Sequence, residues 1–212
     1  MTHIDYTLYL VTDRSVMSAK SLEQAVEQAI QGGCTVVQLR EKYASSREFF
    51  ETAQRVKQIT DSYHIPLIIN DRTDICLAVN AAGIHIGQQD LPAKIVRNMV
   101  GPDKIIGVSA ATLSEAIQAE QDGADYLGVG AMFATSTKTN TRPVTIERLT
   151  QIKQAVQIPV VAIGGIQSSN AATLTKTGID GIAVVSAILA QENITHAAEQ
   201  LKTCFTGAEY EF

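Results

Sequence analysis

The chain has 212 residues, of which 45% are hydrophobic and 18% charged, and its formal net charge is −5 at neutral pH. This composition is typical of one globular domain with a sizeable core, and the acidic balance argues against a general nucleic-acid-binding surface. No stretch is apolar for long enough to span a membrane, and residues 1–5 do not begin a secretion signal, so we expect no membrane association.

The chain contains three widely spaced cysteines, Cys34, Cys76 and Cys204. Their odd number and their spacing argue against a disulfide framework or a zinc site, and they favour a reducing, cytoplasmic location. The sequence leaves the oligomeric state open, including a homo-oligomer.

Short apolar runs rich in β-branched residues recur along the chain, and most of them end in polar residues or glycine. Such runs are typical of strands that are buried on both faces. The predicted strands are Tyr6–Val11, Thr35–Leu39, Leu67–Ile69, Gly83–Ile86, Ile105–Val108, Asp125–Val129, Pro159–Ile163 and Gly181–Val185.

A helical segment follows each predicted strand. In the first of them, apolar residues recur every three or four positions, at Leu22, Ala25, Val26 and Ala29. The predicted helices are Ser21–Ile30, Ser46–Thr60, Thr73–Val79, Pro92–Met99, Leu113–Gln121, Ile146–Val156, Asn170–Lys176 and Ala187–Leu201.

The regular alternation of strand and helix implies parallel strands joined by right-handed crossovers. Eight such units in this length predict an α/β fold, a (β/α)₈ TIM barrel that forms a single catalytic domain over residues 1–212. A doubly wound open sheet is the alternative, although it would not require so regular a count. We expect the polar and aromatic tail, residues 206–212, to fray.

In a (β/α)₈ barrel, the carboxyl ends of all strands meet at one mouth, where active sites are built. The predicted strand ends carry charged, amide and hydroxyl side chains, whereas the opposite ends carry turn residues such as Gly32, Gly33 and Gly123. This asymmetry predicts one polar site. Its members are Asp13, Arg40, Lys42, Asn70, Asp71, Asp90, Ser109, Thr135, Thr137, Lys138, Gly164, Gly165 and Ser186.

Two carboxylates, Asp71 and Asp90, follow neighbouring predicted strands without a histidine or thiol beside them. Oxygen ligands alone suit a hard cation such as Mg²⁺, which commonly takes one or two carboxylates and leaves its other positions to water and substrate phosphate. Each residue also has a purely structural interpretation. Asp71 could cap the next helix, and Asp90 could hold the turn before Pro92.

Arg40 and Lys42 alternate after the second predicted strand, so that in extended backbone they point the same way as Gln38. A third cation, Lys138, lies in the long segment after the sixth strand. Three cations with a divalent ion would fit a diphosphate. The alternative is that these charges are solvated surface, which is the commoner place for any single lysine.

A second anion site is predicted near the last two strands. Gly164 and Gly165 allow a close approach to the backbone, and Val185 and Ser186 open the following helical segment. These two loops often bind phosphate in barrels. The hydroxyl-rich segment that contains Thr135 and Thr137 is long enough to act as a lid. We expect His85, within the fourth strand, to be a hydrogen-bonded barrel residue rather than a catalyst.

Several motifs in chain order resemble the thiamine phosphate synthase (thiamine-phosphate pyrophosphorylase) family, and the likeness covers nearly the whole chain. They are Leu10-Val11-Thr12-Asp13, Val37-Gln38-Leu39-Arg40-Glu41-Lys42, Ile69-Asn70-Asp71-Arg72-Thr73-Asp74, Gly83-Ile84-His85-Ile86-Gly87-Gln88-Gln89-Asp90, Gly128-Val129-Gly130, Thr135-Ser136-Thr137-Lys138, Ala162-Ile163-Gly164-Gly165-Ile166 and Val184-Val185-Ser186.

The resemblance implies a (β/α)₈ transferase of thiamine biosynthesis. It would join 4-amino-2-methyl-5-hydroxymethylpyrimidine diphosphate to 4-methyl-5-(2-hydroxyethyl)thiazole phosphate by a dissociative, carbocation-like mechanism, and release diphosphate. The cofactor would be Mg²⁺, bound by Asp71 and Asp90. The implied pyrimidine-diphosphate contacts are Gln38, Arg40, Lys42, Asn70, Ser109 and Lys138. Of these, Arg40, Lys42, Ser109 and Lys138 would be catalytic. The implied thiazole-phosphate contacts are Thr135, Thr137, Gly165, Val185 and Ser186.

The chain departs from the family pattern after the fifth strand and in the long loop. Ala110 and Ala111 stand where the family usually has a histidine-containing segment, and Ala131 and Ala134 stand where it tends to have proline. Two other functions therefore remain open at this point. One is a thiazole tautomerase, which would not need the magnesium–diphosphate half of the site. The other is a non-catalytic regulator that binds a thiazole phosphate.

Overall fold

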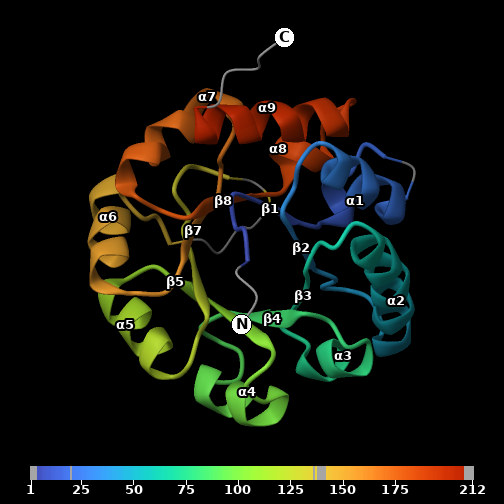
Figure 1. Ribbon diagram of the computed structural model, residues 1–212, viewed down its shortest axis with the longest axis horizontal. Helices are drawn as coiled ribbons and strands as arrows, with labels where there is room; N and C mark the ends of the chain where they lie inside the picture. Colours follow the sequence, from blue (N-terminus) through green and yellow to red (C-terminus); the bar gives the residue numbers. More distant parts are fainter. Residues whose placement is uncertain (1–3, 20, 136, 138–141, 208–212) are drawn as a thin grey trace.

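The computed structural model describes residues 4–19, 21–135, 137 and 142–207. Eight parallel strands close into a barrel in the order β1 to β8, and helices surround it as a ring (Figure 1). Every strand pairs with its two sequence neighbours, and β8 pairs with β1. The predicted (β/α)₈ barrel is therefore confirmed, and the open sheet is not formed.

The strands are short and fall inside or close to their predicted ranges. Their bounds are β1 Leu8–Val11, β2 Val36–Leu39, β3 Leu67–Asn70, β4 Gly83–Ile86, β5 Ile105–Ala110, β6 Tyr126–Val129, β7 Val160–Ile163 and β8 Gly181–Val184. β5 extends two residues beyond the predicted Ile105–Val108, because Ser109 and Ala110 still pair with Gly128 and Val129 of β6. Ser109 thus belongs to the barrel wall and not to a loop.

Five of the α-helices among the described residues begin where a hydroxyl or amide side chain caps them. Ser21, Ser45, Thr112, Thr145 and Asn193 each accept a hydrogen bond from a backbone N–H of the first turn. The α-helices are α1 Leu22–Gln31, α2 Ser46–Ser62, α3 Thr73–Ala78, α4 Ala93–Val100, α5 Leu113–Gln121, α6 Ile146–Ala155, α7 Ser168–Ala171, α8 Ser186–Leu189 and α9 Ile194–Thr206. Short 3₁₀ helices span Arg14–Val16 (η1) and Ala172–Thr177 (η2).

The last two predicted helices were wrong in detail. The predicted helix Asn170–Lys176 is a short α7 that continues into the 3₁₀ helix η2, and the predicted helix Ala187–Leu201 is two helices, α8 and α9. The second helix starts afresh because the Asn193 side chain accepts the His196 N–H and caps it. Thr206 ends α9 instead of fraying, and residues 208–212 of the predicted tail lie outside the described residues.

Side chains alternate between two cores, as parallel strands that are covered by helices require. One set, which includes Leu10, Val37 and Ile84, packs between barrel and helices. The other fills the barrel interior and includes Tyr9 and Tyr126. The same alternation places Gln38 and Ser109 among the inward positions, nearer the mouth. Within the described residues, no helix is both long and apolar enough to cross a membrane.

Candidate active site

The carboxyl end of β2 opens onto a pocket of about 770 Å³. Arg40 and Lys42 both line it, as their shared parity after the strand predicts. The other lining residues are Thr137 and side chains of the loop after β1, the loop after β2 and the first three turns of α2, namely Asp13, Arg14, Ser15, Glu41, Tyr43, Ala44, Glu48, Glu51, Thr52 and Arg55. The pocket holds Arg40 and Lys42, whereas the other predicted site residues of the neighbouring strands do not line it, namely Gln38, Asn70, Asp71, Asp90 and Ser109.

Arg40 is held in place from the β1 loop. Its Nη1 donates to Asp13 Oδ2 at 2.7 Å, and its backbone N–H donates to Thr12 Oγ1 at 3.0 Å. Asp13 is itself fixed, because Oδ1 accepts from the Ser15 backbone N–H at 3.0 Å and from the Ser15 hydroxyl at 2.6 Å. The guanidinium is therefore oriented before any ligand binds.

Asp71 stands directly after β3 in the left-handed backbone region, with φ at +62°. It does not cap the next helix, since Arg72 occupies the N-cap position of α3 without a side-chain cap. Its carboxylate instead forms an ion pair with Lys42 Nζ. The structure therefore disfavours the capping interpretation of Asp71 and joins it to the cations of the pocket.

Asp90 has the structural role considered for it, and its role as a metal ligand stays a prediction. Its Oδ2 accepts the Gly87 N–H at 2.7 Å, which holds the turn after β4. Burial raises the pKa of the Asp90 carboxyl above its usual value, and the adjacent Asp71 raises it further, while the Gly87 hydrogen bond and Lys42 act in the opposite direction. Two carboxylates that repel each other in this way favour a cation between them.

The donor set at this position fits a hard divalent ion. Asp71 and Asp90 supply oxygen ligands only, and among the described residues no group of three or more histidine, cysteine or acidic side chains forms an alternative metal site. Two carboxylates leave most coordination positions to water and to a phosphate ligand. This matches the preference of Mg²⁺, and the residues present therefore fit the ion.

Gln38 and Ser109 face the barrel interior just below the mouth. Gln38 Nε2 donates to Tyr9 Oη at 2.9 Å, and Ser109 Oγ lies 2.9 Å from His85 Nε2. His85 is buried and hydrogen-bonded, as expected for a barrel residue. Asn70 is the last residue of β3 and lies in register with His85 on β4, which places it beside the same group.

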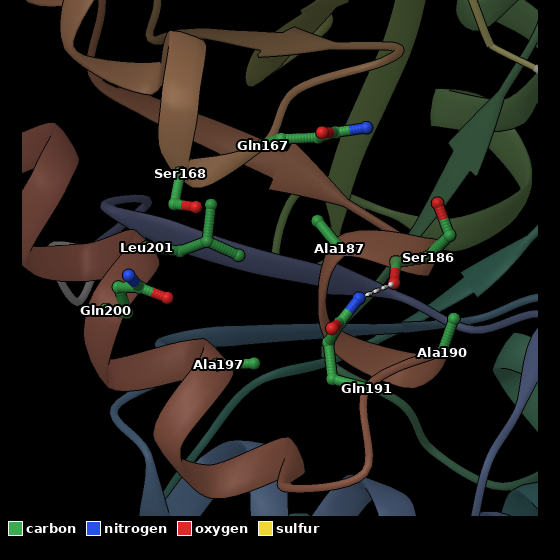
Figure 2. Close-up of a pocket in the computed structure, with 9 residues that line it drawn as sticks. All are labelled: Gln167, Ser168, Ser186, Ala187, Ala190, Gln191, Ala197, Gln200 and Leu201. Atoms are coloured by element: carbon green, nitrogen blue, oxygen red, sulfur yellow. Dashed lines mark hydrogen bonds between the residues drawn. The ribbon is translucent and has the colours of Figure 1, made fainter.

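The predicted second anion region surrounds the ends of β7 and β8. Gly165 has φ at +64°, and a Cβ there would lie 2.5 Å from the carbonyl oxygen of Ala134, so the loop after β6 packs directly on this glycine. Val185 precedes α8, and Ser186 is its first residue. Ser186 also lines a pocket of about 300 Å³ with Gln167 and Gln191 (Figure 2).

Thr135 and Thr137 are the described threonines of the hydroxyl-rich segment. The Thr137 backbone N–H donates to Thr135 Oγ1 at 3.2 Å. Thr137 was expected on the thiazole-phosphate side, yet it lines the same pocket as Arg40 and Lys42. Lys138 lies outside the described residues, so its predicted role stays a prediction.

A family model described as thiamine monophosphate synthase matches residues 8–188. The chain belongs to this family. The thiamine-phosphate synthase of Ruminiclostridium cellulolyticum is 62% identical over 202 residues, which are 95% of this chain and 96% of the relative. That of Clostridium beijerinckii is 57% identical over 202 residues, with coverage of 95% and 97%.

Solved structures agree with this membership of the thiamine monophosphate synthase family. A thiamine phosphate pyrophosphorylase from Pyrococcus furiosus superimposes with a TM-score of 0.88 at 40% identity and covers 96% of each chain. A geranylgeranylglyceryl phosphate synthase from Thermoplasma acidophilum reaches a TM-score of 0.73 at 18% identity over 96% of this chain and 94% of that one, which shows a shared barrel fold only.

The structure adds residues to the neighbourhood of the predicted site that the sequence does not single out. Tyr9 and Tyr126 lie in apolar runs typical of ordinary strand residues, yet both hydroxyls join the hydrogen-bonded group that contains His85. Asp13 was placed at the mouth without its link to Arg40. The sequence carries one signal for the two tyrosines, which is the alternation of inward and outward side chains along a strand. Both tyrosines occupy inward positions of their strands.

Proposed function

We propose that this chain is a magnesium-dependent thiamine-phosphate synthase. It couples 4-amino-2-methyl-5-hydroxymethylpyrimidine diphosphate with 4-methyl-5-(2-hydroxyethyl)thiazole phosphate, and the products are thiamine phosphate and diphosphate. The observation that carries the proposal is the convergence of Arg40, Lys42, Asp71 and Asp90 at one barrel mouth in a member of this family.

Asp71 and Asp90 would hold the Mg²⁺ ion. When bound, the ion neutralises charge on the leaving diphosphate and orients its oxygens. In the free protein, Lys42 partly compensates the two carboxylates through its ion pair with Asp71. We infer that Lys42 exchanges this partner for a phosphate oxygen when the metal and the substrate enter together.

The protein side of the reaction consists of charge stabilisation and orientation. Arg40, already fixed by Asp13, and Lys42 stabilise the negative charge that grows on the diphosphate as its bond to the pyrimidine methylene carbon breaks. Gln38, Asn70 and Ser109 hold the pyrimidine ring, so that the thiazole nitrogen can attack the exposed carbon. This chemistry needs no general base, which agrees with the structural role of His85.

The loops after β6, β7 and β8 would hold the thiazole phosphate. Gly165 gives the backbone a close approach to the β6 loop, and Val185 and Ser186 present backbone N–H groups at the end of β8. Thr135 and Thr137 would add hydroxyl groups, that of Thr137 from the wall of the pocket that contains Arg40 and Lys42. The two substrates would then meet over the open end of the barrel.

Diphosphate release tests this proposal. The purified protein should release diphosphate only when both substrates and Mg²⁺ are present, and chelation by EDTA should stop the release. Replacing Asp71 by asparagine should reduce turnover at least about 100-fold at limiting Mg²⁺, because one of two metal ligands is lost. The exposed α6 substitution Arg148→Met is the control and should leave turnover unchanged.

The two other functions predict different results. A thiazole tautomerase would act on a thiazole phosphate precursor alone, and a regulator would bind the thiazole phosphate without releasing diphosphate. The comparisons support neither, since the similar proteins from Ruminiclostridium cellulolyticum and Clostridium beijerinckii both carry the name of the synthase. Normal turnover of Asp71→Asn at limiting Mg²⁺ would contradict the metal assignment.

A further inference from the structure

A chain of four hydrogen bonds crosses the barrel interior from β2 to β5. Gln38 Nε2 lies 2.9 Å from Tyr9 Oη, and Tyr9 Oη lies 2.7 Å from Tyr126 Oη. Tyr126 Oη then lies 2.9 Å from His85 Nδ1, and His85 Nε2 lies 2.9 Å from Ser109 Oγ. The two ends of this chain are residues that the proposed function places against the pyrimidine. We call these five side chains the polar chain.

The middle of the polar chain is sealed from solvent. Tyr9 is 1% exposed and Tyr126 is 0% exposed. Two glycines provide the space for the rings. A Cβ on Gly107 would lie 2.1 Å from Tyr126 Cζ, and one on Gly128 would lie 3.0 Å from His85 Cε1. The Tyr126 ring could not occupy its present place beside a side chain at position 107, and the His85 ring would have to shift slightly beside one at position 128.

Each tyrosine brings a single hydroxyl proton to the polar chain. Burial raises the pKa of both Tyr9 and Tyr126 well above the usual range, so both stay protonated. A neutral imidazole likewise brings one N–H. Each of these three groups can therefore donate to one neighbour in the chain and accept from the other, and buried polar groups that left a partner unused would be destabilised.

With His85 neutral, only two arrangements satisfy every link and also use each of these three protons within the polar chain. In the first, Gln38 donates to Tyr9, Tyr9 to Tyr126, Tyr126 to His85 Nδ1, and His85 Nε2–H to Ser109. The Gln38 carbonyl then faces away from Tyr9, and the Ser109 proton is directed to a ligand. In the second, every direction is reversed and the Gln38 amide is rotated. We assign the first arrangement, because Gln38 Nε2 is the atom that lies against Tyr9 Oη.

We propose that the polar chain couples the hydrogen-bonding polarity of Gln38 to that of Ser109 and so selects a 4-aminopyrimidine over a 4-oxopyrimidine. A 4-aminopyrimidine presents an amino donor beside a ring-nitrogen acceptor. This pattern complements an acceptor on Gln38 and a donor on Ser109. A 4-oxopyrimidine presents the opposite pattern, a carbonyl acceptor beside a ring N–H, and requires all four hydrogen bonds to reverse together.

Tyr9, Tyr126 and His85 are thus positioning residues that do not touch the substrate. The inference rests on the proposed function, because it takes the pyrimidine diphosphate as the ligand of Gln38 and Ser109. If a hydroxyl in the middle of the polar chain is removed, the Gln38 amide and the Ser109 hydroxyl should each be able to reorient independently of the other. The selectivity between the two pyrimidines should then fall, even where turnover of the amino substrate is largely kept.

The kinetic test compares two tyrosine variants. Tyr126→Phe removes the central hydroxyl, whereas Tyr6→Phe removes a hydroxyl from a neighbouring buried ring, 4.9 Å from that of Tyr126, which is not part of the polar chain. The measured quantity is the ratio of kcat/KM for the 4-amino and 4-oxo pyrimidine diphosphates. Tyr126→Phe should lower this ratio at least about tenfold, and Tyr6→Phe should leave it within about twofold.

An unchanged ratio in Tyr126→Phe would overturn the inference while leaving the synthase activity intact. If the unmodified protein released no diphosphate at all, the proposed function would fail instead. Nitrogen-15 NMR of the ligand-free protein gives a readout without turnover, with His85→Gln to assign the signals. His85 should carry its proton on Nε2 and not on Nδ1. A protonated Nδ1 would contradict the direction that we assign to the polar chain.

Discussion

Asp71 shows how the backbone of one residue restricts what can replace it. Its φ of +62° lies in the left-handed region, which aspartate, asparagine and glycine tolerate better than other residues. The turn directs the carboxylate toward Lys42 and Asp90 at the moment the chain leaves β3. Position 71 therefore requires both a residue that tolerates the left-handed backbone and a negatively charged side chain.

Two substitutions of Asp71 should separate these effects. Both Asp71→Asn and Asp71→Ala should abolish magnesium-dependent turnover. Only the alanine variant should also lose stability, by about 1 kcal/mol, because alanine is strained in the left-handed region and asparagine is not. Thermal unfolding should place the alanine midpoint about 2–4 °C below that of the asparagine variant. Equal midpoints for the two variants would show that the backbone conformation carries no such cost.

At the level of elements, the sequence predicted the strands and most helices because burial and periodicity are local signals. The start of α5 is an example, since Thr112 and an apolar pattern mark it. What the sequence could not predict were pairings across the barrel. The sequence pattern places Ser109 at a strand exit, because it does not reveal pairing with Gly128 of β6, which is distant in the chain. The Tyr9–Tyr126 contact is hidden for the same reason, since the two residues are 117 positions apart.

The acidic side chain in the first turn of α5 ties this helix to the segment after the β6 loop. Glu115 accepts from Arg142 Nη1 at 2.6 Å and from Nη2 at 3.0 Å. It also accepts the Ala111 N–H at 2.8 Å. These contacts, the Arg142 hydrogen bond foremost, hold the pKa of Glu115 below its usual value. The segment that departs from the family pattern, Ala110 and Ala111, is therefore anchored by Glu115.

Glu115→Gln should cost about 0.5–1 kcal/mol of unfolding free energy near neutral pH, a small figure because the Arg142 side chain is 56% exposed. A carboxyl whose pKa is lowered by folding stabilises the protein above its usual pKa, and this contribution is lost as the pH falls through the lowered value. Urea unfolding of both proteins at about pH 7 and about pH 3 should therefore show a difference that disappears in acid. A difference of the same size at both values would exclude the ion pair as its source.

At the scale of the whole molecule, the two ends of the barrel have different roles. The mouth carries the charged pairs and the pockets described above. The opposite end is held by Arg97 in the last turn of α4, whose guanidinium donates to groups of two connections, the one from α4 to β5 and the one from α5 to β6. Its Nη1 donates to the carbonyls of Gly101 and Lys104, and its Nη2 donates to the Gly123 carbonyl and to Asp125 Oδ2. Asp125 in turn accepts the Ile106 N–H.

Arg97→Met should test this separation, because methionine keeps an apolar stem of similar length and removes every donor. Three carbonyls and the Asp125 carboxylate would lose their partner, and we expect a loss of about 2–3 kcal/mol in unfolding free energy. The thermal midpoint should fall by about 4–12 °C. The exposed Arg148→Met, on α6, should change it by no more than about 2 °C. Below its midpoint, Arg97→Met should keep kcat and KM within about twofold of the unmodified protein, since the mouth is built from the other strand ends. A large loss of kcat with an unchanged midpoint would show that the two ends of the barrel are not independent.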